Sequence, residues 1–148
     1  MSKAKLSIDF KGYDILKKQL DSIGGKATER AVESSLKASQ QLIARQVNAA
    51  MTPHNNTGKV KEQIVKNNPV VWTQGMAEIG VGFNIRSESG LDGLPSIFLM
   101  YGTQLHGQPH IAPDRNLYNA VYGSGTRKRV KKIQKETFQK VIERALKK

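Results

Sequence analysis

Two histidines and an aspartate stand four residues apart in this sequence, at His106, His110 and Asp114. On a continuous helix this spacing would align three metal ligands on one face. Pro109 lies between the histidines and Pro113 directly precedes the aspartate, so a continuous helix is not expected here. We therefore interpret both histidines as loop residues, one of them hydrogen-bonded, and predict no metal site.

Other patterns that carry chemistry are missing from the sequence. The chain contains no cysteine, which excludes disulfides, thiolate zinc sites and a cysteine nucleophile. Gly123-Ser124-Gly125 does not fit the Gly-x-Ser-x-Gly pattern of a nucleophile elbow, and we interpret it as a flexible hinge. No glycine-rich loop ends in the Lys-Ser/Thr pair that binds phosphates. The sequence therefore predicts a protein that is not an enzyme and needs no cofactor.

The charge of the chain is concentrated near its C-terminus. The 148 residues carry a net charge of +12, which favours an acidic partner such as nucleic acid, anionic lipid or an acidic protein surface. Ten Lys/Arg and two Glu lie between Thr126 and Lys148, which gives this segment a net charge of +8. Its densest cluster contains Arg127, Lys128, Arg129, Lys131 and Lys132.

This basic cluster has two interpretations. It could bind phosphates with an affinity that depends on salt, or it could be a solvated helix face that keeps the protein soluble. Aromatic residues do not alternate with the cations, so base stacking is not indicated. Any nucleic-acid contact would therefore be a non-specific contact with phosphates.

The hydrophobic periodicity predicts an α+β fold. We expect a small antiparallel sheet of three to four strands, packed on a long helix in the N-terminal half and followed by a basic C-terminal helix. The length suits a single domain, with a body over residues 1–125 and a basic helical arm over residues 126–148. No segment approaches 18 apolar residues and the N-terminus has no apolar run of signal-peptide length, so we expect no membrane contact.

The N-terminal half is predicted to hold the main structural elements. Alternating residues indicate a strand over 6–10, and spacings of three and four indicate a helix over 13–23. A helix of about 24 residues, and so about 36 Å long, should begin with Thr28 as its N-cap and end before Pro53. Residues 60–72 should be a turn that leads into a strand, and this strand should form a hairpin with residues 76–83 that turns near Gly75. Pro69 indicates that the first of these strands lies at an edge of the sheet or carries a bulge.

The C-terminal half is predicted to be loops and helices. Residues 84–93 are polar and rich in glycine, and we expect a mobile loop that reaches a partner. Pro95 should open a short helix over 96–101, and Asp114 should cap another over 115–122. The last helix should cover 126–146. Its apolar face should be formed by Val130, Ile133, Thr137, Val141 and Ala145, and widened by Phe138, Ile142 and Leu146.

The stretch from Phe98 to Thr103 is predicted to link the body to the segment that follows it. We expect Phe98 and Leu99 to anchor the core, and Gly102 to adopt a backbone angle that a side chain would disfavour. Tyr101-Gly102-Thr103 would then be the joint between the body and a solvent-facing turn braced by Pro109 and Pro113.

The order of these motifs resembles a family of small neck or tail-completion proteins of long-tailed bacteriophages, the putative tail components of the gene-product-10-like group of lambdoid phages. That family combines a long helix, a Thr-Gly element, a strand pair, an aromatic-Gly-Thr element, a proline-rich turn and a C-terminal helix. The matching residues here are Thr57, Gly58, Phe98, Tyr101, Gly102, Thr103, Pro109 and Pro113. Met100 stands where the family commonly has an acid, and Ile111 replaces the phenylalanine of the proline-rich turn.

The resemblance implies a structural virion protein without enzymatic activity. Members of this family assemble as a ring, expected to be a hexamer, at the head–tail junction or tail end, where the genome passes through the ring. The implied partners are further copies of the chain, the tail tube or terminator proteins and the head-connector proteins. The implied location is the host cytoplasm during assembly and then the virion. The alternative interpretation is a small basic protein that binds nucleic acid non-specifically.

Overall fold

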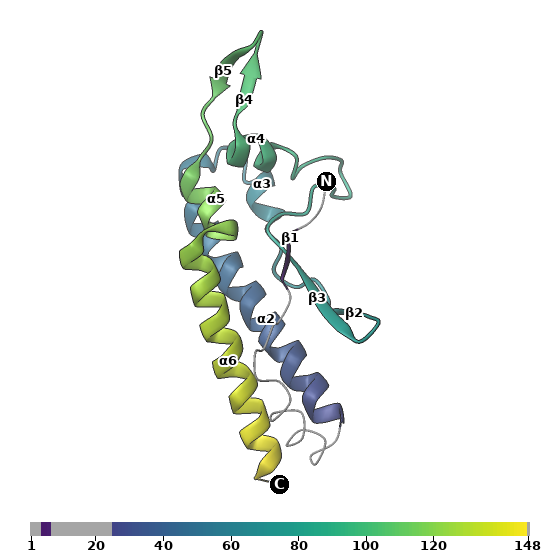
Figure 1. Cartoon of the computed structure of the whole chain (residues 1–148). Helices are drawn as coiled ribbons and strands as arrows, with labels where there is room; N and C mark the ends of the chain where they lie inside the picture. Colours follow the sequence, from purple (N-terminus) through teal and green to yellow (C-terminus); the bar gives the residue numbers. More distant parts are fainter. Residues whose placement is uncertain (1–3, 7–24, 148) are drawn as a thin grey trace.

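Two long antiparallel helices form the length of the molecule in this computed structural model, which describes residues 4–6 and 25–147 (Figure 1). The first is α2 (Gly25–Ala50) and the second is α6 (Ser124–Leu146), and they pack side by side. A three-stranded sheet lies against α2, and a separate hairpin extends from one end of the body. The predicted α+β class is thereby confirmed, including the long helix in the N-terminal half and the basic C-terminal helix.

Helix α2 contacts both the sheet and α6. Leu36, Ile43 and Val47 are buried in the main core, while Ala31 and Ser35 are buried toward α6. The Ser35 hydroxyl donates to Ala31 O at 2.7 Å and lies 3.2 Å from Gln134 O, so these short side chains allow the helices to approach closely.

The predicted start of α2 was wrong, because the helix begins at Gly25 and not at an N-cap of Thr28. Lys26 and Ala27 favour the helical conformation, which extends the helix by almost one turn before the expected cap. The expected helix over 13–23 and residues 7–10 of the expected first strand lie outside the described residues.

The main sheet has the order β1-β3-β2 and is antiparallel throughout. Its strands are β1 (Ala4–Leu6), β2 (Val71–Thr73) and β3 (Met76–Val81). Gln74 and Gly75 join β2 to β3 with φ angles of 51° and 80°, as in the two-residue turns that suit a twisted hairpin. The predicted hairpin and the edge position of its first strand are confirmed.

The segment before β2 differs from the prediction. A short 3-10 helix, η1 (Thr52–His54), follows α2, and α3 (Lys59–Glu62) lies where a turn leading into the strand was expected. Gly58 precedes α3 with a φ of 77°, and this left-handed residue reverses the chain into a helical turn. Extended structure resumes at Ile64, which bridges to Phe83.

The end of the body carries two short helices and a hairpin. Helices α4 (Pro95–Tyr101) and α5 (Arg115–Tyr122) lie where the sequence predicted them. Between them, β4 (Thr103–Leu105) and β5 (Gln108–Ile111) form an antiparallel pair that the sequence analysis interpreted as a loop. Proline is tolerated at Pro109 of β5 because a two-stranded ribbon consists only of edge strands.

The glycine-rich junction before α6 is not a hinge, contrary to the prediction. Only Gly123 separates α5 from α6, and Ser124 and Gly125 belong to the first turn of α6. The Gly123 N–H donates to Asn119 O at 3.0 Å, and a Cβ at Gly123 would lie 2.6 Å from that same oxygen. Glycine is therefore needed here for close packing and not for flexibility.

Helix α6 buries only part of the predicted face: Val130, Phe138 and Ile142 are buried, whereas Leu146 is exposed. Its buried residues are spaced four apart: Thr126, Val130, Gln134, Phe138 and Ile142. Ile133, Thr137, Val141 and Ala145, which the periodicity placed on the buried face, are only half-buried. The stripe winds slowly around the helix because a repeat of four exceeds the 3.6 residues of one turn, and this keeps it in contact with the inclined α2.

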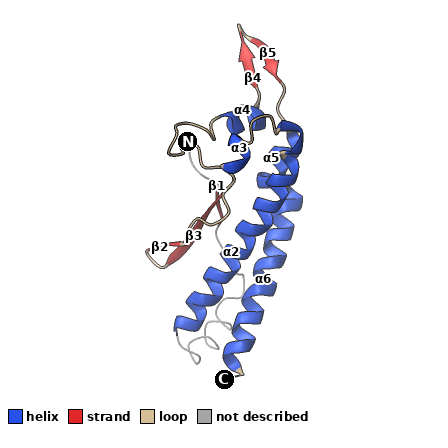
Figure 2. Cartoon of the chain, turned by 180° about the vertical axis from the view of Figure 1, so that it is seen from behind, coloured by secondary structure: helices blue, strands red, loops and turns tan. Residues whose placement is uncertain are grey.

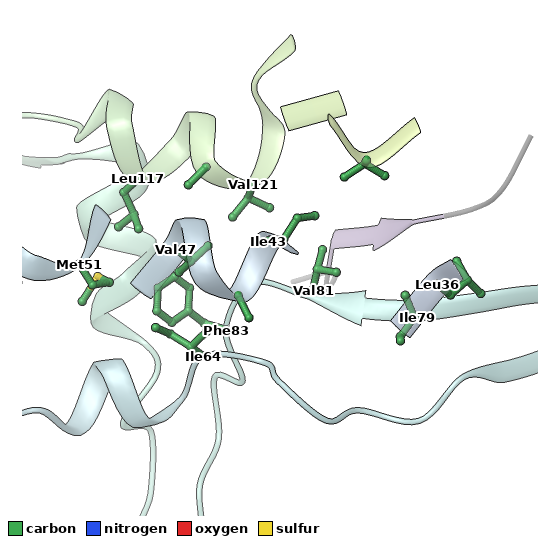
Figure 3. Packing of buried hydrophobic residues seen from close by; sticks show 13 residues of the cluster. Leu36, Ile43, Val47, Met51, Ile64, Ile79, Val81, Phe83, Leu117 and Val121 are labelled. Carbon is green, nitrogen blue, oxygen red and sulfur yellow. The ribbon is translucent and has the colours of Figure 1, made fainter. Parts of the chain in front are cut away.

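The main core lies between α2, β3 and α5. Figure 3 shows the side chains of α2 meeting those of Ile79, Val81 and Phe83 on one side and those of Leu117 and Val121 on the other. A smaller cluster farther along the helix pair contains Ala31, Phe138 and Ile142. Among residues 4–6 and 25–147, no helix has the length and apolar character needed to cross a membrane.

Candidate assembly surface

The β4–β5 hairpin projects beyond the body and is largely exposed (Figures 1 and 2). His106 and Gly107 form its turn with φ angles of 51° and 76°. The register pairs Thr103 with Ile111 and Leu105 with Gln108, with an irregularity next to Thr103. Leu105 and Ile111 therefore share one face, where they are 54% and 40% exposed. A two-stranded ribbon this small is marginally stable on its own in water, and its apolar face is open to solvent.

Aromatic side chains surround the base of the hairpin. Phe98 and Tyr101 on α4 are 43% and 54% exposed, and Tyr118 on α5 is 38% exposed. The Tyr101 and Tyr118 rings meet edge to face, with their centroids 5.8 Å apart. The centroids of the Tyr118 and Tyr122 rings are 5.0 Å apart. Burial, followed by a hydrogen bond with Tyr101, raises the pKa of the Tyr122 phenol. Aromatic residues with a polar end are typical of protein interfaces.

The structure corrects the expected role of Phe98. We expected Phe98 and Leu99 to anchor the core, but only Leu99 packs against it. Ser96 is the fully buried residue of α4, so Leu99, three residues on, faces the same way. Phe98 and Tyr101 are also three apart and lie together on the exposed side.

Gly102 fixes the hairpin to the body, and its predicted special conformation is confirmed. Its φ and ψ are 74° and 174°, a combination that only glycine adopts readily. A Cβ at this position would lie 2.6 Å from Ile111 O and 3.0 Å from Pro113 Cδ. The Thr103 hydroxyl beside it is buried and has no hydrogen-bond partner among the residues that the structure describes.

Asp114 ties three elements together beside this joint. Its N–H donates to Leu99 O at 2.7 Å, and its carboxylate accepts from the Leu117 N–H at 3.1 Å, as an N-cap of α5. The other carboxylate oxygen lies 2.5 Å from His54 Nε2, with both side chains mostly buried. The hydrogen bond from His54 lowers the pKa of Asp114. This pair was not predicted, because sixty residues separate its members and His54 lies in a turn of polar residues.

The other histidines do not join Asp114. His106 is a turn residue and His110 lies in β5, and both are exposed. Within residues 4–6 and 25–147, no group of three His, Cys, Asp or Glu side chains could hold a metal ion.

The motif residues fall into two places. Phe98, Tyr101, Gly102, Thr103, Pro109 and Pro113 all belong to the hairpin or its base. Thr57 and Gly58 instead form the turn before α3, where the Thr57 hydroxyl lies 3.4 Å from the Lys59 N–H. Both overall views place α3 beside α4, at the same end of the body as the hairpin (Figures 1 and 2).

The basic cluster lies on the outer side of α6. Arg127, Lys128, Arg129, Lys131 and Lys132 are all exposed. In the described part of the chain, no carboxylate lies within 4.0 Å of these five side chains. Their charges are therefore available to an anionic partner.

Comparison with known proteins gives no assignment of this chain to a family. No protein-family model, no curated protein and no solved structure matches it.

Proposed function

We propose that this chain is a structural virion protein of a phage or prophage, a neck or tail-completion component that joins head and tail. The observation that carries the proposal is the grouping of the aromatic-Gly-Thr and proline-rich motifs into one exposed surface. Phe98, Tyr101 and Leu105 expose apolar area there, while Gly102 and Pro113 fix its position. An exposed apolar surface of this kind on a small protein is typical of an interaction site.

The function is assembly without catalysis. Copies of the chain form a ring, expected to be a hexamer, through contacts between different patches of neighbouring subunits, as closed rings require. The ring then binds tail-tube or terminator proteins on one side and head-connector proteins on the other. The chain acts first in the host cytoplasm and then at the head–tail junction or tail end of the virion.

Native mass spectrometry tests this proposal. The full chain is mixed with the connector and tail-tube proteins encoded beside its gene, and complexes are recorded together with negative-stain images. We expect a complex with at least one of these proteins, and a weaker one for Tyr101→Asp than for the control Leu91→Asp. Leu91 is 52% exposed and lies outside the hairpin and its base, so the control adds the same charge elsewhere. Absence of any complex with both proteins would contradict the proposal.

The exposed cations of α6 support a second candidate function, non-specific binding of nucleic acid. Duplex DNA binding measured against salt concentration tests it. Neutralising Lys128, Arg129, Lys131 and Lys132 together should reduce the slope of log affinity against log salt by about 3.6, at about 0.9 for each phosphate contact. Neutralising Lys26, Lys37, Lys59 and Lys66, which are also exposed, is the matched control. No binding at low salt, or equal slopes for both variants, would exclude this function.

A further inference from the structure

The cations of α6 are not spread evenly around the helix. Consecutive residues of an α-helix are about 100° apart, since one turn takes 3.6 residues. At this spacing, an arc of about 140° holds five exposed cations: Arg127, Lys128, Lys131, Lys132 and Lys135. We call these five residues the basic strip. No carboxylate among the residues that the structure describes lies within 4.0 Å of a strip side chain.

Arg129 lies outside the basic strip, although it is next to Lys128 in the sequence. Its position is about 130° from the centre of the strip, whereas Lys135 lies within about 10° of that centre. The Arg129 side chain extends toward Gly125, because its Nη2 is 3.7 Å from the place that a Cβ of Gly125 would take. Within about 40° of Arg129, the exposed charges farther along α6 alternate in sign: Glu136, Lys140, Glu143 and Lys147. That side of the helix is therefore a nearly neutral, solvated face.

The segments of α2 and α5 that flank the strip carry no free acid. Figures 1 and 2 show α6 on the side of α2 away from the sheet, and Gln46 donates to the Thr126 hydroxyl at 3.1 Å. The strip therefore begins beside the C-terminal part of α2, where residues 35–50 contain no Asp or Glu. The one acid of α5 and its N-cap is Asp114, which pairs with His54. Neither helix offsets the positive potential of the strip, which favours a polyanionic partner.

The strip fits phosphates better than it fits a lipid surface or unpaired bases. A helix that enters a membrane interface needs a free apolar face, but Val130, Phe138 and Ile142 of α6 are buried. Proteins that hold single-stranded nucleic acid stack its bases on exposed aromatic side chains. In the described chain, the large exposed aromatic residues all lie on other elements: Trp72, Phe98, Tyr101 and Tyr118. The contact that remains available to the strip is with phosphates.

The strip also matches the charge density of a duplex. From Arg127 to Lys135, the helix rises about 12 Å. Duplex DNA carries about seven phosphate charges over that length, at one per about 1.7 Å of its axis. The duplex therefore offers a phosphate for each of the five cations, whereas one strand carries only half as many charges over the same length.

We propose that the basic strip binds the phosphate backbone of duplex DNA, with Lys135 at the centre of the contact and Arg129 outside it. This inference rests on the second candidate function, non-specific binding of nucleic acid, and specifies the form of nucleic acid and the residues that touch it. In the fourfold variant described above, only three of the neutralised residues belong to the strip. The slope of log affinity against log salt should therefore fall by about 2.7 in that variant, and not by about 3.6.

Two single substitutions in the full-length chain test the contact. Lys135→Gln and Arg129→Gln each remove one exposed cation from the same helix, and circular dichroism checks that both variants are folded. Fluorescence anisotropy of a labelled duplex of random sequence gives the affinity from about 50 to 200 mM salt. Over this range, Lys135→Gln should lose about 3.5-fold less affinity than wild type, because its slope is smaller by about 0.9. Arg129→Gln should change the slope by less than half of that amount.

Lysine labelling provides a second measurement that needs no substitution. The full-length chain is acetylated with and without the duplex at low salt, and mass spectrometry gives the rate at each lysine. Lys131 and Lys135 should react several-fold more slowly when the duplex is present. Lys140 and Lys147, which are exposed on the Arg129 side of the same helix, should react at an unchanged rate.

Three results would overturn the inference: equal slope changes for the two single variants, equal protection of Lys140 and Lys135, or tighter binding of the same sequence as a single strand. In each case nucleic acid is still bound, so the candidate function stands and the assignment of the strip is wrong. Absence of duplex binding at low salt would remove the candidate function together with the inference. Binding to vesicles of equal parts phosphatidylcholine and phosphatidylserine would then identify lipid as the anionic partner. The assembly function proposed for the β4–β5 hairpin is independent of these outcomes.

Discussion

Replacing Gly102 with alanine tests whether this residue fixes the hairpin to the body. The φ and ψ of Gly102 lie in a region that costs a non-glycine residue about 1–3 kcal/mol. The new Cβ would also lie 2.6 Å from Ile111 O, a backbone atom that cannot move without displacing β5. Such overpacking costs a further 1–3 kcal/mol, roughly, so we expect Gly102→Ala to lower the free energy of unfolding by about 2–6 kcal/mol.

Gly107 offers a matched control in the same hairpin. Its φ is 76°, close to that of Gly102, but a Cβ there would have no atom within 4 Å. Gly107→Ala should therefore cost only the conformational strain, about 1–2 kcal/mol. The difference between the two variants isolates the close contact, and it corresponds to a Tm difference of several degrees at about 2–4 °C per kcal/mol.

Urea unfolding followed by circular dichroism gives both free energies. Hydrogen exchange of the Asp114 amide, which donates to Leu99 O at 2.7 Å, shows whether the joint opens locally. That amide should exchange faster in Gly102→Ala than in Gly107→Ala. Equal stability of the two variants, together with equal exchange at Asp114, would refute the role assigned to Gly102.

Three further substitutions test the packing of α6 and the contact of Asp114. Phe138→Ala should lower the free energy of unfolding by about 3–5 kcal/mol in urea, because Phe138 is buried against α2, whereas a freely hinged arm would show no change. Gln134→Met should leave stability equal or raise it by up to about 1 kcal/mol, since the Gln134 Nε2 is buried without a partner; a large loss would show that the amide has one. Asp114→Asn keeps a capping side chain but loses the charge paired with His54, so it should cost about 1 kcal/mol near neutral pH. Because the folded pKa of Asp114 is lowered from 3.8, its stabilising effect is present above about pH 4 and is lost as pH falls through the folded pKa. The stabilities of wild type and Asp114→Asn should therefore converge in acid, and a constant difference down to pH 2, roughly, would contradict the stabilising role of the Asp114 carboxylate.

Local sequence signals predicted the elements that depend on local chemistry. The cap at Asp114 and the proline that opens α4 both lie where they were expected. The turn at Gly75 and the conformation of Gly102 were also predicted correctly. Glycine is favoured where the backbone needs a positive φ, so its position in the sequence indicates such a conformation.

The errors arose where contacts distant in the sequence decide the structure. Gly123 and Gly125 suggested flexibility, but the close approach of Gly123 to Asn119 and the burial of Phe138 against α2 hold α6 in place. The exposure of Phe98 could not be predicted from its type, because it depends on which side of α4 meets the core. The pair of His54 and Asp114 likewise needs the fold, which brings η1 beside the start of α5.

The candidate surface was predicted only in part. Tyr101, Gly102 and Thr103 were predicted to form a joint. The β4–β5 hairpin after them was predicted to be a loop. The exposure of Val71 and Trp72 was not predicted, because the pattern indicated only a strand, and an edge strand of three residues leaves such side chains exposed. Exposure of apolar residues is a property of the folded surface and not of the local pattern.

The most direct measurement of the proposed role is the fraction of heads joined to tails when this gene is deleted from its phage or prophage. Negative-stain images of lysates give this fraction for the deletion alone and for complementation with wild type, Leu91→Asp or Tyr101→Asp. We predict separate heads and tails in the deletion, joined particles with wild type and Leu91→Asp, and at least a several-fold reduction with Tyr101→Asp. Joined particles at wild-type frequency in the deletion would contradict the account.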